Sequence, residues 1–125
     1  MEQFSKVLAG ILKNSMYALL KKSETVTFSP EIFLGLKVNK DMLEITIRDN
    51  GSGIDENIKD KIFAPFFTTK TTGEAAGVGL YLCREIVQNH RGTIEVESKK
   101  GDYTQFLITI PVYQPKTITP PKEEE

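Results

Sequence analysis

The first twenty residues of the chain carry an amphipathic pattern that is typical of a helix. Apolar positions recur at spacings of three and four across residues 2–20, and they are Phe4, Val7, Leu8, Ile11, Ala18 and Leu19. At 3.6 residues per turn, this spacing places them on one face. The same spacing returns between Gly79 and His90, and we expect that second helix to stop at Gly92.

The regions between and after these helices favour strands. Residues 31–38 and 42–48 predict a pair of strands joined by a short turn, and residues 55–62 predict a short helix. Residues 93–97 and 104–111 predict a second pair of strands. This order predicts an α+β fold, a two-layer sandwich with helices packed on one face of a mixed, largely antiparallel sheet.

Two segments carry neither pattern. Residues 64–78 are rich in threonine and end among glycines, and an irregular stretch of this length in a compact domain is typical of a functional lid. Residues 114–125 contain three prolines and end in Lys-Glu-Glu-Glu, which predicts a disordered tail. We therefore expect one domain over residues 1–113, a mobile lid within it, and a tail.

Composition excludes several function classes. Hydrophobic residues make up 39% and charged residues 26%, which excludes a wholly disordered or collagen-like chain. A net charge of -1 gives no overall attraction to nucleic acid or to anionic lipid. The single cysteine cannot form an internal disulfide, and no apolar run approaches the ~20 residues that span a bilayer. We expect a cytoplasmic domain that is monomeric in isolation and contacts neither nucleic acid nor membrane directly; anchoring of a longer parent protein in a membrane stays open.

The first candidate functional residue is Asn14, an amide within the apolar face of the first helix. At about 100° per residue, its side chain points within about 20° of Val7, and Gly10 lies one turn earlier on the same side. A buried amide must be hydrogen-bonded. Asn14 therefore either bonds a neighbouring backbone group or offers Mg²⁺ a hard oxygen ligand.

The second candidate is Asp49, which closes an apolar strand and precedes Gly51 and Gly53. A carboxylate only accepts hydrogen bonds, so it can recognise an exocyclic amine such as that of adenine, and the glycines permit close backbone approach. An ordinary Asp-Gly turn has the same sequence, so both interpretations stay open on this motif alone.

The third candidate is the glycine-rich entry to the second helix, Gly77-Val78-Gly79-Leu80, with Lys70 upstream. Free N–H groups and the positive end of the helix dipole suit a phosphate there. A flexible linker is the alternative. A Walker loop is excluded because no Gly-Lys-Ser/Thr follows, and a dinucleotide fingerprint because no strand leads directly into the glycines.

In this order, the motifs resemble the ATP-binding catalytic domain of sensor histidine kinases, a family grouped with DNA gyrase, MutL and the heat-shock chaperone ATPases. The resemblance covers about Phe4 to Val112, almost the whole chain. It rests on Leu12-Lys13-Asn14-Ser15, Asp49-Asn50-Gly51-Ser52-Gly53-Ile54, Ile62-Phe63-Ala64-Pro65-Phe66-Phe67-Thr68-Thr69-Lys70, Gly77-Val78-Gly79-Leu80, and Gly101 with Thr104-Gln105-Phe106.

The resemblance implies a role for each matching position. Asn14 would bind Mg²⁺, Asp49 would take the adenine amino group, and Thr104 would support Asp49 and adenine through water. Lys70 would reach phosphate beside the lid and, with Asn14, form the catalytic pair. The remaining positions of the implied ATP site are Gly51, Gly53, Ile54, Phe66, Phe67, Gly77, Val78, Gly79 and Leu80.

The chain also departs from the family pattern. Gly10 stands where related kinases usually carry a second asparagine and where the gyrase branch carries the glutamate that activates water. Efficient ATP hydrolysis by the gyrase mechanism is therefore not expected. In the lid, Ala75 and Ala76 replace a glycine and a threonine, which could stiffen it or remove a phosphate contact.

The resemblance implies the Mg-ATP-binding catalytic fragment of a two-component sensor histidine kinase. It would transfer the γ-phosphate of ATP to a histidine on a separate dimerisation domain, with a response regulator downstream. Two alternatives stay open, a degenerate ATP-binding docking module and a serine kinase of the anti-sigma-factor type. We expect no autophosphorylation of the isolated chain, because its one histidine, His90, should pack in the core at a helix end. Cys83 should also be a core residue.

Overall fold

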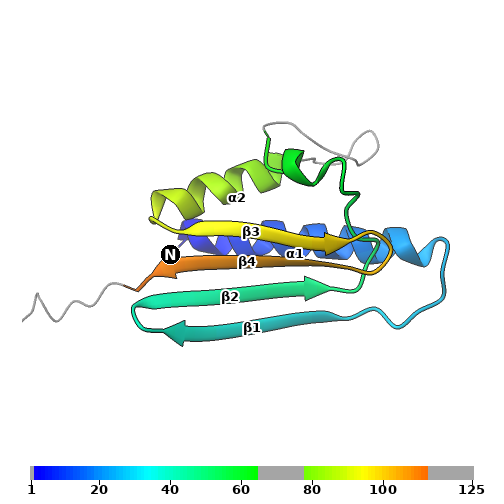
Figure 1. The fold of residues 1–125 in the computed structure, drawn as a ribbon, viewed down its shortest axis with the longest axis horizontal. Coiled ribbons are helices and arrows are strands. Elements are labelled where there is room, and N and C mark those ends of the chain that lie inside the picture. The colour runs from blue at the N-terminus through cyan, green and yellow to red at the C-terminus, as the bar shows by residue number, and fades with distance from the viewer. Residues whose placement is uncertain (1, 65–77, 113–125) are drawn as a thin grey trace, which may run out of the picture.

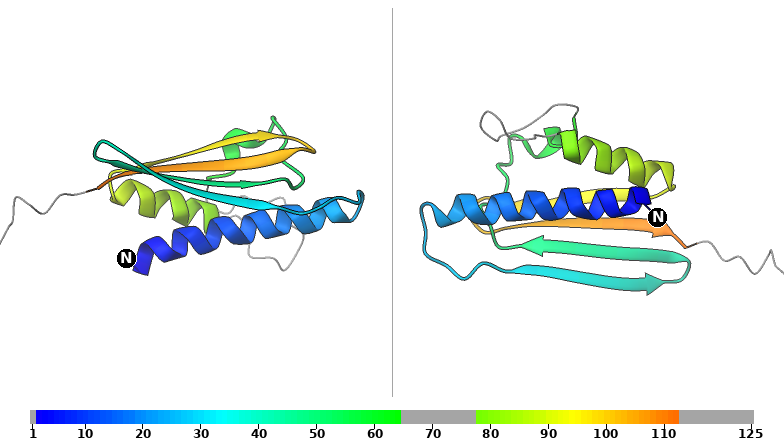
Figure 2. Two further views of the ribbon diagram at one scale, coloured as in Figure 1. Left: turned by 90° about the horizontal axis from the view of Figure 1, so that it is seen from below. Right: turned by 180° about the vertical axis from the view of Figure 1, so that it is seen from behind.

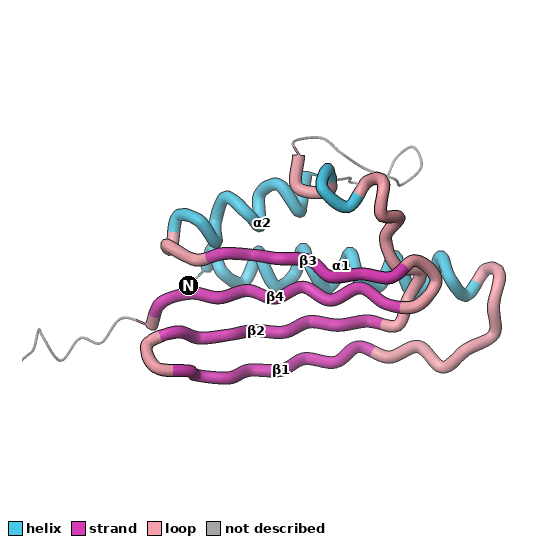
Figure 3. The backbone as a smooth tube through the Cα atoms, viewed as in Figure 1, coloured by secondary structure: helices cyan, strands magenta, loops and turns pink. Residues whose placement is uncertain are grey.

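The computed structural model describes residues 2–64 and 78–112, which form an α+β sandwich (Figures 1 and 3). The helices are α1 (Glu2–Ser23) and α2 (Val78–Asn89), and a single 3₁₀ turn, η1, spans Lys59–Lys61. The strands are β1 (Ile32–Asn39), β2 (Met42–Asp49), β3 (Thr93–Lys99) and β4 (Tyr103–Pro111). The predicted long helices and the four predicted strands are confirmed, each with small changes at its ends.

The four strands form one sheet in the order β1-β2-β4-β3, and every neighbouring pair is antiparallel. Among the described residues the sheet is therefore fully antiparallel and not mixed. Both helices lie on the same face of this sheet, as Figure 2 shows from below. The predicted two-layer arrangement is confirmed.

The core lies between the helices and the sheet. Alternate residues of β2 and β4 point toward the helices, because successive side chains of a strand point to opposite faces. They meet the apolar faces of α1 and α2, where side chains recur every three or four residues. The buried cluster consists of Val7, Ile11, Ile45, Ile47, Ile62, Leu80, Cys83, Val87, Phe106 and Ile108.

The edge strand β1 lies outside this core. Its residues Leu34, Leu36 and Val38 pair with core positions of β2, so they share the helix-facing side of the sheet. They nevertheless stay 57%, 69% and 67% exposed. The helices therefore cover β2, β4 and β3, and they leave the apolar side of β1 open.

The predicted helix at 55–62 is wrong in length and type. The Asp55 carboxylate accepts a hydrogen bond from the Asn57 backbone N–H at 2.9 Å, and the Ile58 N–H bonds back to the Asp55 carbonyl at 3.0 Å. Such local side-chain bonds offer the backbone an alternative to a continuous helix. The segment is therefore a series of turns that contains only η1.

Helix α2 ends at Asn89, three residues before the expected stop at Gly92. The backbone N–H of Gly92 bonds to the Val87 carbonyl at 2.9 Å, and Arg91 takes the left-handed conformation with φ of 65°. Together these features form a Schellman-type helix end. Gly92 has another reason to be glycine, because a Cβ there would lie 2.4 Å from the Thr109 carbonyl oxygen.

The prediction that His90 packs in the core is wrong. The residue follows the last residue of α2 and is exposed. Its ring meets the Phe4 ring edge-on at 6.2 Å, and Nδ1 lies 2.8 Å from the Ile86 carbonyl oxygen. Because a carbonyl only accepts, Nδ1 carries the proton in this contact. Cys83, in contrast, is buried as predicted, and burial raises the pKa of its thiol to about 11.

Candidate nucleotide-binding site

The candidate site is built around Asp49, the last residue of the central strand β2. The side chain is 1% exposed, and its Oδ1 accepts a hydrogen bond from the Gly51 backbone N–H at 2.9 Å. Its Oδ2 is also buried but has no hydrogen-bond partner. Burial raises the pKa of this carboxyl, while the Gly51 N–H, the Ser15 hydroxyl and the Lys22 charge lower it. Asp49 is therefore a buried acceptor with one oxygen free.

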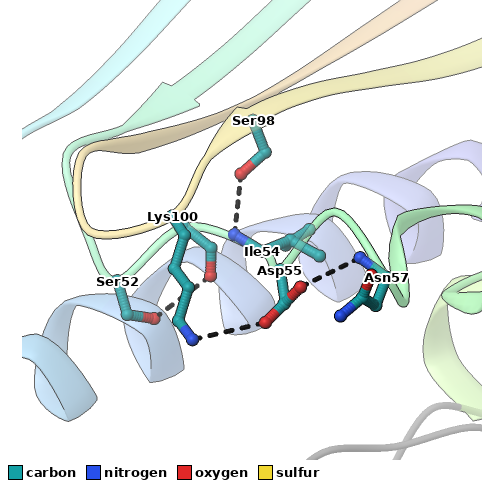
Figure 4. A network of polar contacts seen from close by, with 7 residues as sticks. Ser52, Ile54, Asp55, Asn57, Ser98 and Lys100 are labelled. Carbon is teal, nitrogen blue, oxygen red and sulfur yellow. Dashed lines mark hydrogen bonds and ion pairs between the residues drawn. The ribbon is translucent and has the colours of Figure 1, made fainter.

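Thr104 lies opposite Asp49 on β4, as a fully buried partner in the strand register. Its hydroxyl, however, lies 3.2 Å from the Ser98 hydroxyl. Ser98 donates its only proton to the Tyr103 carbonyl at 2.7 Å. It accepts a hydrogen bond from the Ile54 N–H at 2.7 Å (Figure 4). Thr104 must then be the donor to Ser98, because each hydroxyl has a single proton. In this arrangement Thr104 can only accept a bond from adenine or from water.

The glycines of the Asp49–Gly53 loop have packing roles in the protein itself. A Cβ on Gly51 would lie 2.7 Å from the Ala18 carbonyl carbon, so this glycine lets the loop approach α1. Gly53 has φ of 72°, and a Cβ there would lie 2.2 Å from the Lys99 carbonyl oxygen. Both glycines thus allow close backbone approach within the protein, toward α1 and toward the β3–β4 turn. A contact of either glycine with a nucleotide stays a prediction.

Polar contacts hold the same loop from both sides. The Ser52 N–H donates to the Ala18 carbonyl at 3.1 Å, and the Gly101 N–H donates to the Ser52 carbonyl at 2.6 Å. The Asn50 amide bonds Ser29 and Glu31 of the connection to β1 at 2.9 and 2.8 Å. These bonds tie α1, the start of β1 and the β3–β4 turn to the end of β2, which holds Asp49 in place.

Two charged side chains border the loop. The Lys22 ammonium donates to the Asn50 carbonyl at 2.9 Å and lies 4.6 Å from the centre of the Phe28 ring. Lys100 contacts the Asp55 carboxylate at 3.3 Å (Figure 4). The Asn57 backbone N–H and then Lys100 lower the pKa of Asp55. Asp55 is therefore engaged in local structure, whereas Asp49 keeps a free oxygen.

The middle of α1 supplies the other side of the site. Asn14 is half-buried, and its amide makes no hydrogen bond to another described residue. Ser15 follows it, fully buried, with an Oγ that has no hydrogen-bond partner. Sequence reasoning missed Ser15 as a site residue. Its position four residues after Ile11 and three before Ala18 was the available signal, because that spacing places it on the buried face.

The proposed phosphate end lies at the start of α2. The helix begins at Val78, and Leu80 packs into the core with 8% of its surface exposed. Figures 1 and 2 place the start of α2 and the end of β2 at the same end of the molecule. Ile54 is half-buried against the core and stands in the loop after Asp49. The predicted residues Phe66, Phe67, Lys70, Ala75, Ala76 and Gly77 lie outside the described part of the chain.

The structure thus brings Asp49, Ile54 and Thr104 together at one end of the sheet, whereas Asn14 lies in the middle of α1. Comparison of the sequence with known families gives a match to "Histidine kinase-, DNA gyrase B-, and HSP90-like ATPase" over residues 2–114. The chain belongs to this family. Within the family it corresponds to the catalytic ATPase domain of two-component sensor histidine kinases, as the following relatives show.

Three curated relatives illustrate the likeness. Sporulation kinase E of Bacillus subtilis is 35% identical over 90% of this chain, and sensor histidine kinase AtsR of Burkholderia thailandensis is 32% identical over 95%. Cyanobacterial phytochrome A of a Nostoc strain is 41% identical over 67%. The matched segments span only 14%, 20% and 11% of those proteins, so the chain corresponds to one part of much longer relatives.

A solved structure has the same fold. The catalytic domain of histidine kinase ThkA, in a nucleotide-free form, superposes with a TM-score of 0.71 at 30% sequence identity. The match covers 88% of this chain and 66% of that one. The helices and antiparallel sheet described above are therefore those of a histidine kinase catalytic domain. Across residues 2–64 and 78–112, no helix has the length and apolar character that crossing a bilayer requires.

Proposed function

We propose that this chain binds Mg-ATP and positions its γ-phosphoryl group for transfer to a histidine on a separate dimerisation domain. The observation that carries the proposal is the buried Asp49, whose Oδ2 lacks a donor. An unpartnered buried carboxylate oxygen is costly, and a bound amine would supply the missing donor. Adenine presents such an amine, whereas guanine would place a carbonyl oxygen against the carboxylate.

Metal binding would involve Asn14. Its amide oxygen is the type of hard ligand that Mg²⁺ prefers, and the amide is not engaged elsewhere among the described residues. Mg²⁺ would neutralise charge on the phosphates when bound. The backbone N–H groups at the start of α2, with Gly77 and Gly79 before and within its first turn, would orient the phosphates. Lys70 would add a positive charge near the lid.

Catalysis by this chain would then consist of positioning and charge neutralisation, as in phosphoryl transfer generally. Asp49 would orient the base and α2 the phosphates, so that the γ-phosphoryl faces the incoming imidazole. The relatives are sensor kinases, which supports a histidine acceptor and a response regulator downstream. We place this activity in the cytoplasm. Gly10, which cannot act as a second ligand or base, supports one other candidate, an ATP-binding docking module.

A phosphotransfer experiment separates these candidates. The isolated chain, incubated with γ-labelled ATP and Mg²⁺, should bind nucleotide and acquire no acid-labile phosphate. His90 is exposed, but eleven residues separate it from Gly79, about 16 Å at 1.5 Å per residue. Transfer needs the reacting atoms at roughly 3–3.5 Å.

Adding a histidine-bearing dimerisation domain in trans should restore labelling on that domain. Binding without any transfer to such domains would favour the docking module. Acid-labile label on His90 of the chain alone would contradict transfer to a separate dimerisation domain. His90 of one copy would then be accepting the phosphate from ATP bound to another copy.

A further inference from the structure

We propose that Ser15 is a positioning residue of the nucleotide site, whose hydroxyl donates to Oδ2 of Asp49 and orients that carboxylate toward the base. This inference rests on the proposed ATP-binding function. It concerns a residue of α1 whose side chain is fully buried and whose Oγ has no hydrogen-bond partner.

The donors around Asp49 leave Oδ2 to Ser15. Its Oδ1 is occupied by the Gly51 N–H at 2.9 Å, and Oδ2 is free. Thr104, the facing residue of β4, gives its proton to Ser98. Ser15 is close enough for its hydroxyl to lower the pKa of the Asp49 carboxyl. Among the described residues it is therefore the hydroxyl beside Asp49 that still has a proton to give.

Ser15 also lacks the hydrogen bond that serines usually make within their own helix. A serine inside a helix commonly donates to the carbonyl three or four residues before it. Ser23, near the end of the same helix, does so, with its Oγ 2.6 Å from the Leu20 carbonyl oxygen. Ser15 makes no such bond. A buried hydroxyl without a partner costs free energy, so an alanine would suit helix packing better unless the hydroxyl has a use.

The packing of the loop on α1 brings the two residues near each other. Gly51, two residues after Asp49, packs against the Ala18 backbone, and Ala18 lies three residues after Ser15 on the same buried face of the helix. In the nucleotide-bound protein, Ser15 would donate to Oδ2 along one lone pair and the adenine amine would donate along another. The carboxylate would then be held at both oxygens, by Gly51 on one side and by Ser15 on the other. A carboxylate that is oriented before binding loses less freedom when the base arrives.

Ser15→Ala tests this proposal, with Ser23→Ala as the matched control on the same helix. Ser15→Ala should unfold at nearly the same temperature as the unsubstituted chain, because removing an unpartnered buried hydroxyl and removing its support of the charged Asp49 carboxylate act in opposite directions. Its affinity for Mg-ATP should nevertheless fall roughly tenfold, the usual loss for a hydrogen bond to a charged group. Ser15→Cys keeps a side chain of similar size and a weak donor, so its affinity for Mg-ATP should lie between those of Ser15→Ala and the unsubstituted chain.

The pH profile adds a readout that packing alone would not move. The groups acting on Asp49 are the Gly51 N–H, the Ser15 hydroxyl and the Lys22 ammonium, and each favours the charged carboxylate. Removing the Ser15 hydroxyl raises the pKa of Asp49 further. The weakening of ATP binding on acidification should therefore begin at higher pH in Ser15→Ala than in Ser23→Ala. Titration of ATP itself is the same in both proteins and cancels.

The possible outcomes distinguish failure of this inference from failure of the proposed ATP-binding function. If the unsubstituted chain does not bind ATP, the proposed function fails. If it binds, and Asp49→Asn weakens binding while Ser15→Ala matches Ser23→Ala at every pH, Ser15 is a packing residue and only this inference is overturned. An affinity loss in Ser15→Ala that is equally large in the Asp49→Asn background would also overturn it, because the hydroxyl would then act without the carboxylate.

Discussion

Two groups of buried polar side chains meet at the end of β2, and they differ in how completely they are satisfied. On one side, Ser98, Thr104 and the Ile54 backbone form a closed set of hydrogen bonds. On the other side, Asp49 Oδ2 and Ser15 Oγ are more deeply buried than the half-buried Ser98, and they have no partner. Closed sets stabilise the fold, whereas unpartnered buried atoms are expected where a ligand completes them. The difference separates a structural half of the site, which holds Thr104 and Ile54 in place, from a half whose buried atoms are left for a ligand.

The largest expected effect lies in the structural half, at Gly53. Gly53→Ala combines a left-handed backbone with a Cβ placed 2.2 Å from the Lys99 carbonyl oxygen. We expect a loss of roughly 2–5 kcal/mol in the free energy of unfolding. Gly101→Ala is the control, since it has φ of 84° with nothing within 4 Å, and it should lose only about 1 kcal/mol. Equal losses in urea unfolding would show that strain alone matters and the close contact does not.

Ser98→Ala should also act on stability more than on binding. It removes the acceptor of the Ile54 N–H and the donor to the Tyr103 carbonyl. Leaving such groups unpaired costs about 1–3 kcal/mol. Where the variant is folded, its affinity for ATP should fall less than that of Asp49→Asn, because Ser98 acts on the site only through Thr104 and Ile54. A variant with native stability and greatly weakened ATP binding would reverse the assignment of the two halves.

Asp49→Asn should weaken ATP binding without lowering stability. It replaces an acceptor oxygen by a donor facing the adenine amine, and affinity for ATP should fall about ten- to hundredfold by calorimetry. Stability should not fall with it, because burial of the charged carboxylate is itself unfavourable.

The pH dependence of stability follows from the same residue. The pKa of Asp49 is raised in the folded protein above its ordinary value of 3.8. Its contribution to stability is therefore fully present below the unfolded pKa and is lost as pH rises through the folded pKa. Asp49→Asn should remove this fall from the curve of unfolding free energy against pH. If the curve is unchanged in Asp49→Asn, the pKa of Asp49 is not raised by folding.

The smallest expected effect concerns Asn14 and depends on the metal. Asn14→Ala should weaken binding of Mg-ATP by up to about tenfold, the scale of one lost ligand contact, and should change ATP binding in EDTA less. Asn57→Ala is a suitable exposed control, because that amide lies outside the site. Equal weakening in both buffers would make Asn14 a structural amide.

Much of the fold could be predicted because burial follows simple periods. The face of α1 and the alternation in β2 and β4 each repeat a single hydrophobic pattern, and all three were found. The same reasoning failed at 55–62, where one Asx turn competes with helix, and at His90, where the helical pattern continues one residue beyond the helix. It also gave no sign that β1 would stay uncovered, since exposure depends on where the helices pack.

The site was predicted in outline and not in its hydrogen bonds. Asn14, Asp49 and Thr104 carry recognisable chemistry in recognisable motifs. Ser15 was missed because its spacing places it on the buried face of α1 but does not show that its hydroxyl lacks a partner there. The direction of the Thr104 proton depends on Ser98, which lies in a different strand. Hydrogen-bond directions of this kind depend on the three-dimensional arrangement of the partners, so they cannot be predicted from the sequence pattern.

The central claim, that the open carboxylate at the end of β2 recognises adenine, is tested most directly by calorimetric titration with ATP and GTP in Mg²⁺. The account predicts that ATP binds at least about tenfold more tightly than GTP, because the guanine carbonyl cannot donate to Asp49 Oδ2. It predicts that this preference disappears in Asp49→Asn. Equal affinities for ATP and GTP in the unsubstituted chain would contradict the claim.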